Sequence, residues 1–476
     1  MAVTPTAPGV YIEEIPSGVR TITGVSTAIG AFVDYFSRGP MNKAVQVFSF
    51  ADFERQFGGL DLRSEASYAI QQFFLNGGTT AWVVRTTSTN NPAAAAAITL
   101  QDGAGDNVLV ASAASPGAWG NNVRLDVDYG TTDPSRFFNL TVTEVVLVAG
   151  KPQVVNSETF RNLVIDSTQP NDAAAVVNAG SKLIQLALAT ATPTSTKAPA
   201  QTGTISNGFA GGTLPAGTPK PNDSMTVALG GNPAKVIKLG ATPPTTLASL
   251  AATLQGLIRT SHDPNLANVS VALVGSSASK VFLQFKAGTG NPSDILTFAD
   301  GAGTLASALG LAGAGAAAAN VQQYALGGTA AGAQASPQTG SDGVWDPASD
   351  LDGMVGGLSG DPAQKTGMQA LLDVDLFNIL CIPATTRFPA GSDNSAFEVA
   401  TGANSLCDLR RAFYILDPPQ GPGPAGTNDT VTAIVAWLDA NDSLRNRNAA
   451  LYFPRVDIPD PLNSFCLLYT SDAADE

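Results

Sequence analysis

Side chains that could perform chemistry are few in this sequence, and the only histidine is His262. It lies between Ser261 and Asp263, which supply the residue types of a hydrolytic triad. A working triad brings its members together from separate elements, whereas these residues are contiguous. We therefore interpret the Ser-His-Asp-Pro segment at residues 261–264 as a surface turn.

The pattern formed by Gly360, Lys365 and Thr366 resembles part of a phosphate-binding loop. The residue directly before the lysine is Gln364, where that loop requires glycine, and no predicted strand leads into the segment. We therefore expect the start of a helix at this position.

The spacing of Asp350, Asp352 and Gly353 resembles part of a calcium-binding loop. The spacing of the remaining ligands does not fit, and the terminal glutamate of such a loop is missing. We interpret these residues as a solvated turn.

The cysteines are Cys381, Cys407 and Cys466, and none of them forms a CxxC pair. With one histidine they are too few for a Cys/His metal site or a disulfide framework. Cys381 lies between Leu380 and Ile382, where a free cysteine usually packs in the core as a small hydrophobe. We predict no catalytic residues, no cofactor and no metal site.

The composition predicts a folded protein with several domains. Of the 476 residues, 44% are hydrophobic and 13% are charged, which allows large cores and excludes a disordered polyelectrolyte. A chain of this length corresponds to about three domains. The net charge of -14 opposes binding to phosphate backbones and to anionic lipid. We expect no nucleic-acid partner and no direct membrane binding.

The N-terminal part of the chain predicts an arm followed by an α/β unit. Residues 8–16 are β-prone, are bracketed by prolines and have no hairpin partner nearby, so we interpret them as an extended arm. An ordinary edge strand of the first domain is the alternative. Residues 28–33 are typical of a strand covered on both faces. Ser49 and Ser64 each precede a helical apolar stripe that ends in paired glycines, and residues 81–85 return as a strand.

The middle of the chain predicts two domains of different composition. Residues 91–200 contain β-prone runs and predict a β-rich domain. Residues 201–340 combine predicted strands with an amphipathic helix at 247–258, which indicates an inserted α+β domain. We interpret its Ala/Gly-rich end, residues 301–341, as a soft helix and linker.

Beyond residue 341, predicted helices and strands alternate strictly. Helices are predicted over residues 363–372, 395–411 and 431–441, and strands over residues 376–382, 412–416 and 449–453. This alternation implies right-handed crossovers and a parallel, doubly wound sheet. The predicted fold class is multidomain α/β and α+β. The predicted divisions are an N-terminal arm (1–26), an N-terminal α/β part of the core (27–90), a β-rich domain (91–200), an inserted domain (201–340), a terminal α/β domain (341–465) and a tail (466–476).

Short segments, spread in order over nearly the whole chain, resemble phage contractile tail sheath proteins. They are residues 8–14 (PGVYIEE), 38–40 (RGP), 57–59 (FGG), 116–121 (PGAWGN), 365–368 (KTGM), 378–383 (NILCIP) and 451–454 (LYFP). The tract from residue 222 to about 335 corresponds to the variable inserted domain of that family. The resemblance implies that the terminal domain is subtilisin-like in fold alone, which accounts for a doubly wound pattern without a triad.

The resemblance also implies a structural function and no enzymatic activity. The chain would polymerise as hexameric rings around a tail tube and contract to drive the tube through the host envelope during genome ejection. Val10, Tyr11, Ile12, Glu13 and Glu14 would form an intersubunit arm that adds a strand to a neighbour's sheet. The partners would be neighbouring sheath subunits and the tail tube, baseplate and tail terminator proteins. The location would be the virion tail, assembled in the host bacterial cytoplasm.

The C-terminal end departs from that family. Residues 466–476 resemble a translated sequencing adaptor, and they replace the region that sheath proteins carry after Pro459-Asp460-Pro461. We predict a C-terminal truncation, and a divergent genuine tail is the alternative.

Other functions remain open at this point. A hydrolase-like α/β enzyme would need a ligand pocket, with strongly shifted ionisation, at the corners of Asp417 and Arg455. A phage-derived contractile injection system would use a similar sheath. A tail-fibre adhesin would need extended repeats, and we find none in the sequence.

Overall fold

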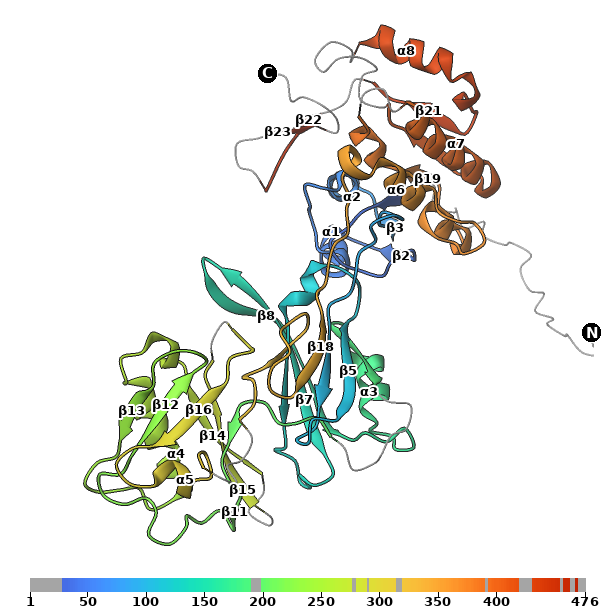
Figure 1. Cartoon of the computed structure of the whole chain (residues 1–476). Coiled ribbons are helices and arrows are strands. Elements are labelled where there is room, and N and C mark those ends of the chain that lie inside the picture. The colour runs from blue at the N-terminus through green and yellow to red at the C-terminus, as the bar shows by residue number, and fades with distance from the viewer. Residues whose placement is uncertain are drawn as a thin grey trace, which may run out of the picture.

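The computed structural model describes residues 28–189, 198–275, 280–288, 291–313, 319–389, 393–418, 430–453, 457–462 and 467–469. In Figure 1 these residues form an elongated, mixed α/β molecule. A parallel-sheet unit lies at one end, a β-rich unit in the middle and an inserted unit at the other end. The predicted arm, Val10 to Glu14, lies outside the described residues.

The parallel-sheet unit contains one six-stranded sheet in the order β2-β3-β1-β19-β20-β21. Its central strand β1 (Ile29–Asp34) pairs in parallel with β3 (Thr80–Arg85) and with β19 (Ile379–Cys381). Segments that the sequence analysis assigns to two separate regions therefore form one sheet. The other strands are β2 (Ala44–Val47), which is antiparallel to β3, and the parallel strands β20 (Phe413–Leu416) and β21 (Ala449–Leu451).

Helices cover both faces of this sheet. The helices are α1 (Phe50–Phe57), α2 (Glu65–Leu75), α6 (Pro347–Ser359), α7 (Asp393–Arg410) and α8 (Val431–Ala440). Phe32 of β1 packs into the core that contains Phe53 and Phe57 of α1. Ala31 and Val33, the neighbours of Phe32, pack into the other core with residues of α6 and α7. This alternation confirms the prediction of a strand buried on both faces.

Both predicted serine caps are present. The Ser49 side chain accepts a hydrogen bond from the backbone of Asp52 at the start of α1, and Ser64 accepts one from Ser67 at the start of α2. The α1 helix ends at Gly58 with a φ of 97°, in the left-handed region that favours glycine.

The β-rich unit is a sandwich of two antiparallel sheets that share one core. One sheet has the order β17-β6-β7-β8, and the other has the order β18-β4-β5-β9. Their bounds are β4 (Ala97–Gln101), β5 (Asn107–Ala113), β6 (Val123–Asp128), β7 (Phe138–Val148), β8 (Lys151–Leu163), β9 (Ile184–Leu188), β17 (Tyr324–Ala325) and β18 (Gln334–Gln338), with α3 (Ala173–Gly180) beside β9.

The inserted unit has its own core around α4 (Leu247–Arg259). Its elements are β10 (Thr204–Ile205), β11 (Phe209–Ala210), β12 (Ser224–Leu229), β13 (Lys235–Lys238), β14 (Ser270–Gly275), β15 (Lys280–Lys286), β16 (Leu296–Asp300) and α5 (Leu305–Ala308). Asp126 of β6 links it to the β-rich unit, because its carboxylate accepts hydrogen bonds from Thr202, Lys286 and Gln323. The domain boundaries themselves stay a prediction.

Three sequence interpretations are wrong. The tract 301–341 contains α5 and also the strands β17 and β18, which return to the β-rich unit. The predicted helix over 363–372 is a turn followed by a 3-10 helix, Gly367–Asp373, because Lys365 has a φ of 54°. Asp350 is buried inside α6, where Ser88, Asn90 and Asn91 donate to it. It is therefore no solvated turn.

We expect Phe57→Ala to destabilise the parallel-sheet unit by about 3–5 kcal/mol, since Phe57 is fully buried and lies 5.3 Å from Phe36 between ring centroids. Urea unfolding followed by tryptophan fluorescence measures this loss. Phe48→Ala is the matched control, because Phe48 is exposed and its loss should stay within about 0.5 kcal/mol. Equal effects of the two substitutions would contradict the assigned core.

Candidate functional site

Of the residues considered for chemistry, His262 lies in the inserted unit, whereas Asp350, Lys365, Cys381 and Cys407 lie in the parallel-sheet unit. His262 is exposed in a turn with a φ of 58°, which confirms the surface-turn prediction. Lys365 is exposed and pairs with Asp373. Cys381 is partly buried beside the α1 core, and Cys407 is fully buried. Burial raises the pKa of Cys407 to about 12, so its thiol is unreactive at neutral pH.

A buried polar cluster lies where β1 ends. The carboxylate of Asp34 accepts hydrogen bonds from the backbone of Tyr35 (2.7 Å) and Ala66 (3.0 Å) and from the hydroxyl of Ser64 (3.1 Å). Asp34 and Ser64 are fully buried. Burial raises the pKa of Asp34, and the hydrogen bonds oppose this shift. Asp34 thereby anchors the start of α2 to the end of β1.

Glu65 extends this cluster toward Arg387. Its Oε1 lies 3.4 Å from Nε of Arg387, and its buried Oε2 has no hydrogen-bond partner among the described residues. Burial raises the pKa of Glu65, while the nearby guanidinium of Arg387 lowers it. Arg387 also donates to the carbonyl of Arg63, so it ties the segment after β19 to the start of α2.

This cluster lies at the carboxyl end of parallel strands, where doubly wound folds place ligands. Its serine hydroxyl is enclosed and caps a helix, and His262 is in another unit, so no nucleophile and base are paired here. Within the described residues, no group of His, Cys, Asp or Glu side chains is arranged to hold a metal ion. The cluster positions α2 and the residues after β19. Arg455 of the enzyme alternative lies outside the described residues.

A second buried charge, Arg85, lies at the end of β3, where the parallel-sheet and β-rich units meet. Its side chain is fully buried. Its guanidinium donates to the carbonyl oxygens of Gly39 (2.8 Å), Pro116 (2.7 Å) and Ser37 (3.4 Å). Burial lowers the pKa of Arg85 to about 10, which still leaves it charged at neutral pH. Arg85 therefore joins the two units through their backbones.

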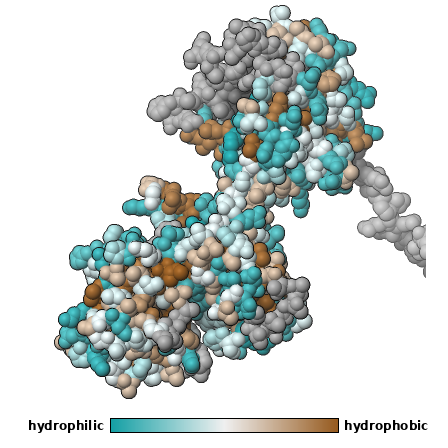
Figure 2. Space-filling model, viewed as in Figure 1, coloured by the Kyte–Doolittle hydropathy of each residue, from teal (hydrophilic) through white to brown (hydrophobic). Residues whose placement is uncertain are grey.

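Further polar contacts surround Arg85 at this junction. Asp342 accepts hydrogen bonds from Arg63 (3.0 Å) and from the backbone of Ala118 (2.8 Å). Ala94 and Ser341 exchange backbone hydrogen bonds of 2.8 and 2.9 Å, which hold the outgoing and returning chains together. In Figure 2 the junction forms a narrow neck between the two bodies of the molecule. Because these contacts cross it from several elements, we call the neck the joint and expect its two units to move as one body.

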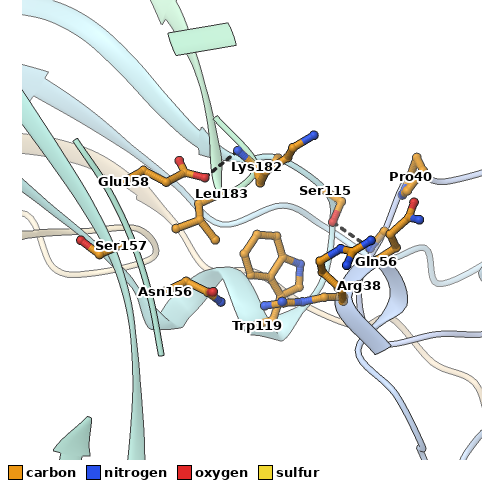
Figure 3. Close-up of a pocket in the computed structure, with 13 residues that line it drawn as sticks. Arg38, Pro40, Gln56, Ser115, Trp119, Asn156, Ser157, Glu158, Lys182 and Leu183 are labelled. Carbon is orange, nitrogen blue, oxygen red and sulfur yellow. Dashed lines mark hydrogen bonds between the residues drawn. The ribbon is translucent and has the colours of Figure 1, made fainter. Parts of the chain in front are cut away.

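A groove of about 690 Å³ opens beside this joint (Figure 3). Arg38 lies over the ring of Trp119, 4.6 Å from its centroid, and pairs with Glu144. The parallel-sheet unit also lines the groove with Gly39, Pro40, Arg55 and Gln56. The β-rich unit lines it with Ala114, Ser115, Asn156, Ser157, Glu158, Lys182 and Leu183. The groove is therefore shared by both units and combines cationic, carboxylate and aromatic groups.

The sequence analysis missed both buried charges. Asp34 and Arg85 each end an apolar strand, in the segments IGAFVD and TAWVVR. The signal in the sequence was a charged residue at the end of a largely apolar strand. The charged side chain at such a position is buried next to the sheet and needs hydrogen-bond partners there.

Comparison with known proteins gives limited similarity. No family model matches the sequence, and no curated protein matches it. One similar solved structure is a sheath tail protein from Desulfitobacterium hafniense, with 19% identity, a TM-score of 0.23 and a match over 40% of this chain and 38% of that chain. Another is a sheath tail protein from Listeria innocua, with 16% identity, a TM-score of 0.24 and a match over 50% of this chain and 39% of that chain. The chain thus covers about two fifths of the length of each of these proteins.

No helix in the described ranges has the length and apolar character that crossing a membrane requires.

We expect Arg85→Met to weaken the joint strongly, since each buried carbonyl left without a donor costs about 1–3 kcal/mol. Arg85→Lys should lose less, because it keeps the charge but not the planar fork of donors. Chemical unfolding measures both losses. Arg55→Met is the control, because its ion pair with Asp52 is on the surface. If Arg85→Met were as mild as this control, the joint would not depend on Arg85.

We expect Glu65→Gln to change how stability depends on pH. A carboxyl whose pKa is raised by folding holds more protons in the folded state, so its stabilisation is complete below the ordinary value of 4.5 and is lost as the pH rises above it. Over part of that range, the free energy of unfolding of the wild type should fall by up to about 1.4 kcal/mol per pH unit more than that of the variant. Melting temperatures measured from about pH 5 to pH 9 test this expectation. Glu54→Gln on the exposed face of α1 is the control, and identical slopes for all three proteins would refute the assignment.

Proposed function

We propose that this chain is the structural subunit of a contractile tail sheath. It polymerises as hexameric rings around a tail tube, and its contraction drives the tube through the host envelope. A phage tail and a phage-derived injection system use this subunit in the same way. The partners are neighbouring copies and the tube, baseplate and terminator proteins.

One observation carries the proposal: segments that resemble the sheath family, distant in sequence, converge on the joint. Arg85 donates to Gly39 of the RGP segment and to Pro116 of the PGAWGN segment. Gly367 of the KTGM segment donates its N–H to Asn42, 2.9 Å away and close after RGP. The resemblance therefore concerns residues that meet in space.

The joint suits a subunit that must transmit force. During contraction a sheath subunit rotates and slides while it stays attached to its neighbours. A joint built from a buried guanidinium and backbone hydrogen bonds moves its two units as one body, so repacking occurs between copies. The free energy comes from a metastable extended lattice that passes to one with better interfaces, without nucleotide consumption. The terminal α/β region is subtilisin-like in fold alone.

The attachment between copies is assigned to Val10, Tyr11, Ile12, Glu13 and Glu14. An added strand is held by main-chain hydrogen bonds, which tolerate changes in the surrounding side chains. In this proposal, a hinge near Pro16 and Gly18 lets the arm keep its partner while the subunits move. This connection persists while the other interfaces change.

We expect deletion of residues 1–16 to leave the monomer folded and to prevent the formation of tubes. The test uses the chain with residues 466–476 replaced by the C-terminal region of a sheath relative, because the proposal requires that region for assembly. Negative-stain microscopy detects tubes, and thermal unfolding reports on the fold. The undeleted form is the control and should form tubes or rings. Equal assembly with and without the arm would overturn strand exchange, and uniform monomers in both would overturn the proposed function.

A further inference from the structure

The β7–β8 hairpin extends beyond the sheet to which it belongs. The partner strand β6 pairs with β7 only from Asn139 to Glu144, whereas the pairing of β7 with β8 continues to Val148 and Lys151. The turn consists of Ala149 and Gly150, both with positive φ (51° and 75°), as in a tight hairpin turn of type I′. In Figure 1 the hairpin, labelled β8, projects from the middle of the molecule near the neck.

The projecting part, residues 145–155, carries large apolar side chains in solvent. Leu147 is 71% exposed and Val154 is 60% exposed, and Val148 and Val155 are also exposed. Figure 2 shows this concentration of hydrophobic residues on the projecting lobe. A cluster of exposed apolar side chains on a projecting hairpin indicates an interaction site, because these side chains do not pack in the core of their own chain.

The chemistry of the tip favours a protein partner over a membrane. Its only charge is Lys151, and it contains no Trp, Tyr or Phe that would anchor it at a lipid interface. The chain's net charge of -14 also opposes anionic lipid.

The hairpin also has unpaired backbone along both sides. No strand of the described residues pairs with the outer side of β8 or with the outer side of Val145–Val148, because β6 ends opposite Glu144. Free strand edges pair readily with another strand. A partner can therefore be held by main-chain hydrogen bonds in addition to apolar contact.

The groove beside the joint fits such a partner. Its wall contains three consecutive residues of β8, Asn156, Ser157 and Glu158. Because consecutive side chains of a strand point to opposite faces, a groove lined by all three runs along the free edge of β8. Trp119 and Leu183 add apolar surface, and the carboxylate of Glu158 accepts hydrogen bonds from Ser181 and from the backbone of Lys182.

We propose that the tip of the hairpin of one copy, residues 145–155, docks into the joint groove of a second copy. The free edge of Val145–Val148 pairs with the free edge of β8 at Asn156–Glu158, and Leu147 contacts the apolar wall formed by Trp119 and Leu183. The volume of about 690 Å³ suits a few side chains of this size.

This contact joins two different surfaces, so it is heterologous and generates either a closed ring or an open helical array. The tip is much smaller than the roughly 20–30 residues a side of a stable isolated interface. The contact is therefore weak between two copies and effective when many act together. It rests on the proposed function, since it adds a second link between sheath subunits that is independent of the N-terminal arm.

Cross-linking between two variants tests the contact. Leu147→Cys and Ser157→Cys are made separately in the chain with residues 466–476 replaced as above, which also removes Cys466. A bifunctional thiol reagent is added to each variant and to their mixture. We expect cross-linked dimers containing both variants in the mixture, at least tenfold above either variant alone. Val236→Cys on the distant strand β13, which is exposed, replaces Leu147→Cys in the control mixture and should give the background yield. Background yield in the test mixture, or dimers of Leu147→Cys alone, would overturn the proposal.

A charge substitution provides the second readout. Leu147→Asp should abolish the cross-link of a Val148→Cys tip to the Ser157→Cys groove, while Val236→Asp should leave it unchanged. Unchanged melting temperatures exclude misfolding, since both sites are exposed. The same samples are imaged by electron microscopy. Tubes without the cross-link would refute this contact and leave the sheath function standing, whereas the cross-link without tubes or rings would support the contact and count against the sheath.

Discussion

A fully buried guanidinium with only backbone acceptors around it is the constraint on which the arrangement of this molecule depends. Arg85 ends β3, and its charge is compensated by the carbonyl oxygens of Ser37, Gly39 and Pro116. Desolvation of this charge is costly, so the acceptors must stay in place. Two of them follow β1 and the third belongs to the β-rich unit. Arg85 therefore contacts the parallel sheet, the turn after β1 and the sandwich at once, and it helps to position them relative to one another.

The two ends of the sandwich are connected in different ways. Toward the parallel sheet, the neck has the buried Arg85 and paired chains, with Ala94 and Ser341 in mutual hydrogen bonding. Toward the inserted unit, the partly buried carboxylate of Asp126 accepts hydrogen bonds from Thr202, Lys286 and Gln323. The backbone of Ala287 also donates to the buried side chain of Gln322, and Gly203 donates its N–H to the carbonyl of Val321 in the core of the sandwich. Buried contacts therefore hold both ends of the sandwich.

Much of the local structure follows from the sequence, and the spatial connections do not. Ser49 and Ser64 predict their helices because a cap is a local interaction, and residues 28–33 predict a buried strand because apolar periodicity is local too. The pairing of Gly30 with Ile379 is not visible in any local pattern, so the two α/β regions were expected as separate parts. Asp350 was misread for the same reason, since its partners Ser88, Asn90 and Asn91 are distant in sequence. The groove depends on β8 and Arg38 meeting in space, which no motif indicates.

The central position of β1 between β3 and β19 has a consequence for biosynthesis. Residue 85 leaves the ribosome long before residue 379, and at about 5–20 residues per second the interval is roughly 15–60 s. During this time β1 and β3 have an open apolar edge and one face without α6 and α7. The sandwich and the inserted unit can fold in that interval, because their strands, including β17 and β18, pair among themselves and precede residue 379. The nascent half-sheet is therefore the stage at which the chain is most exposed to aggregation, and a chaperone that binds short apolar strands would act there.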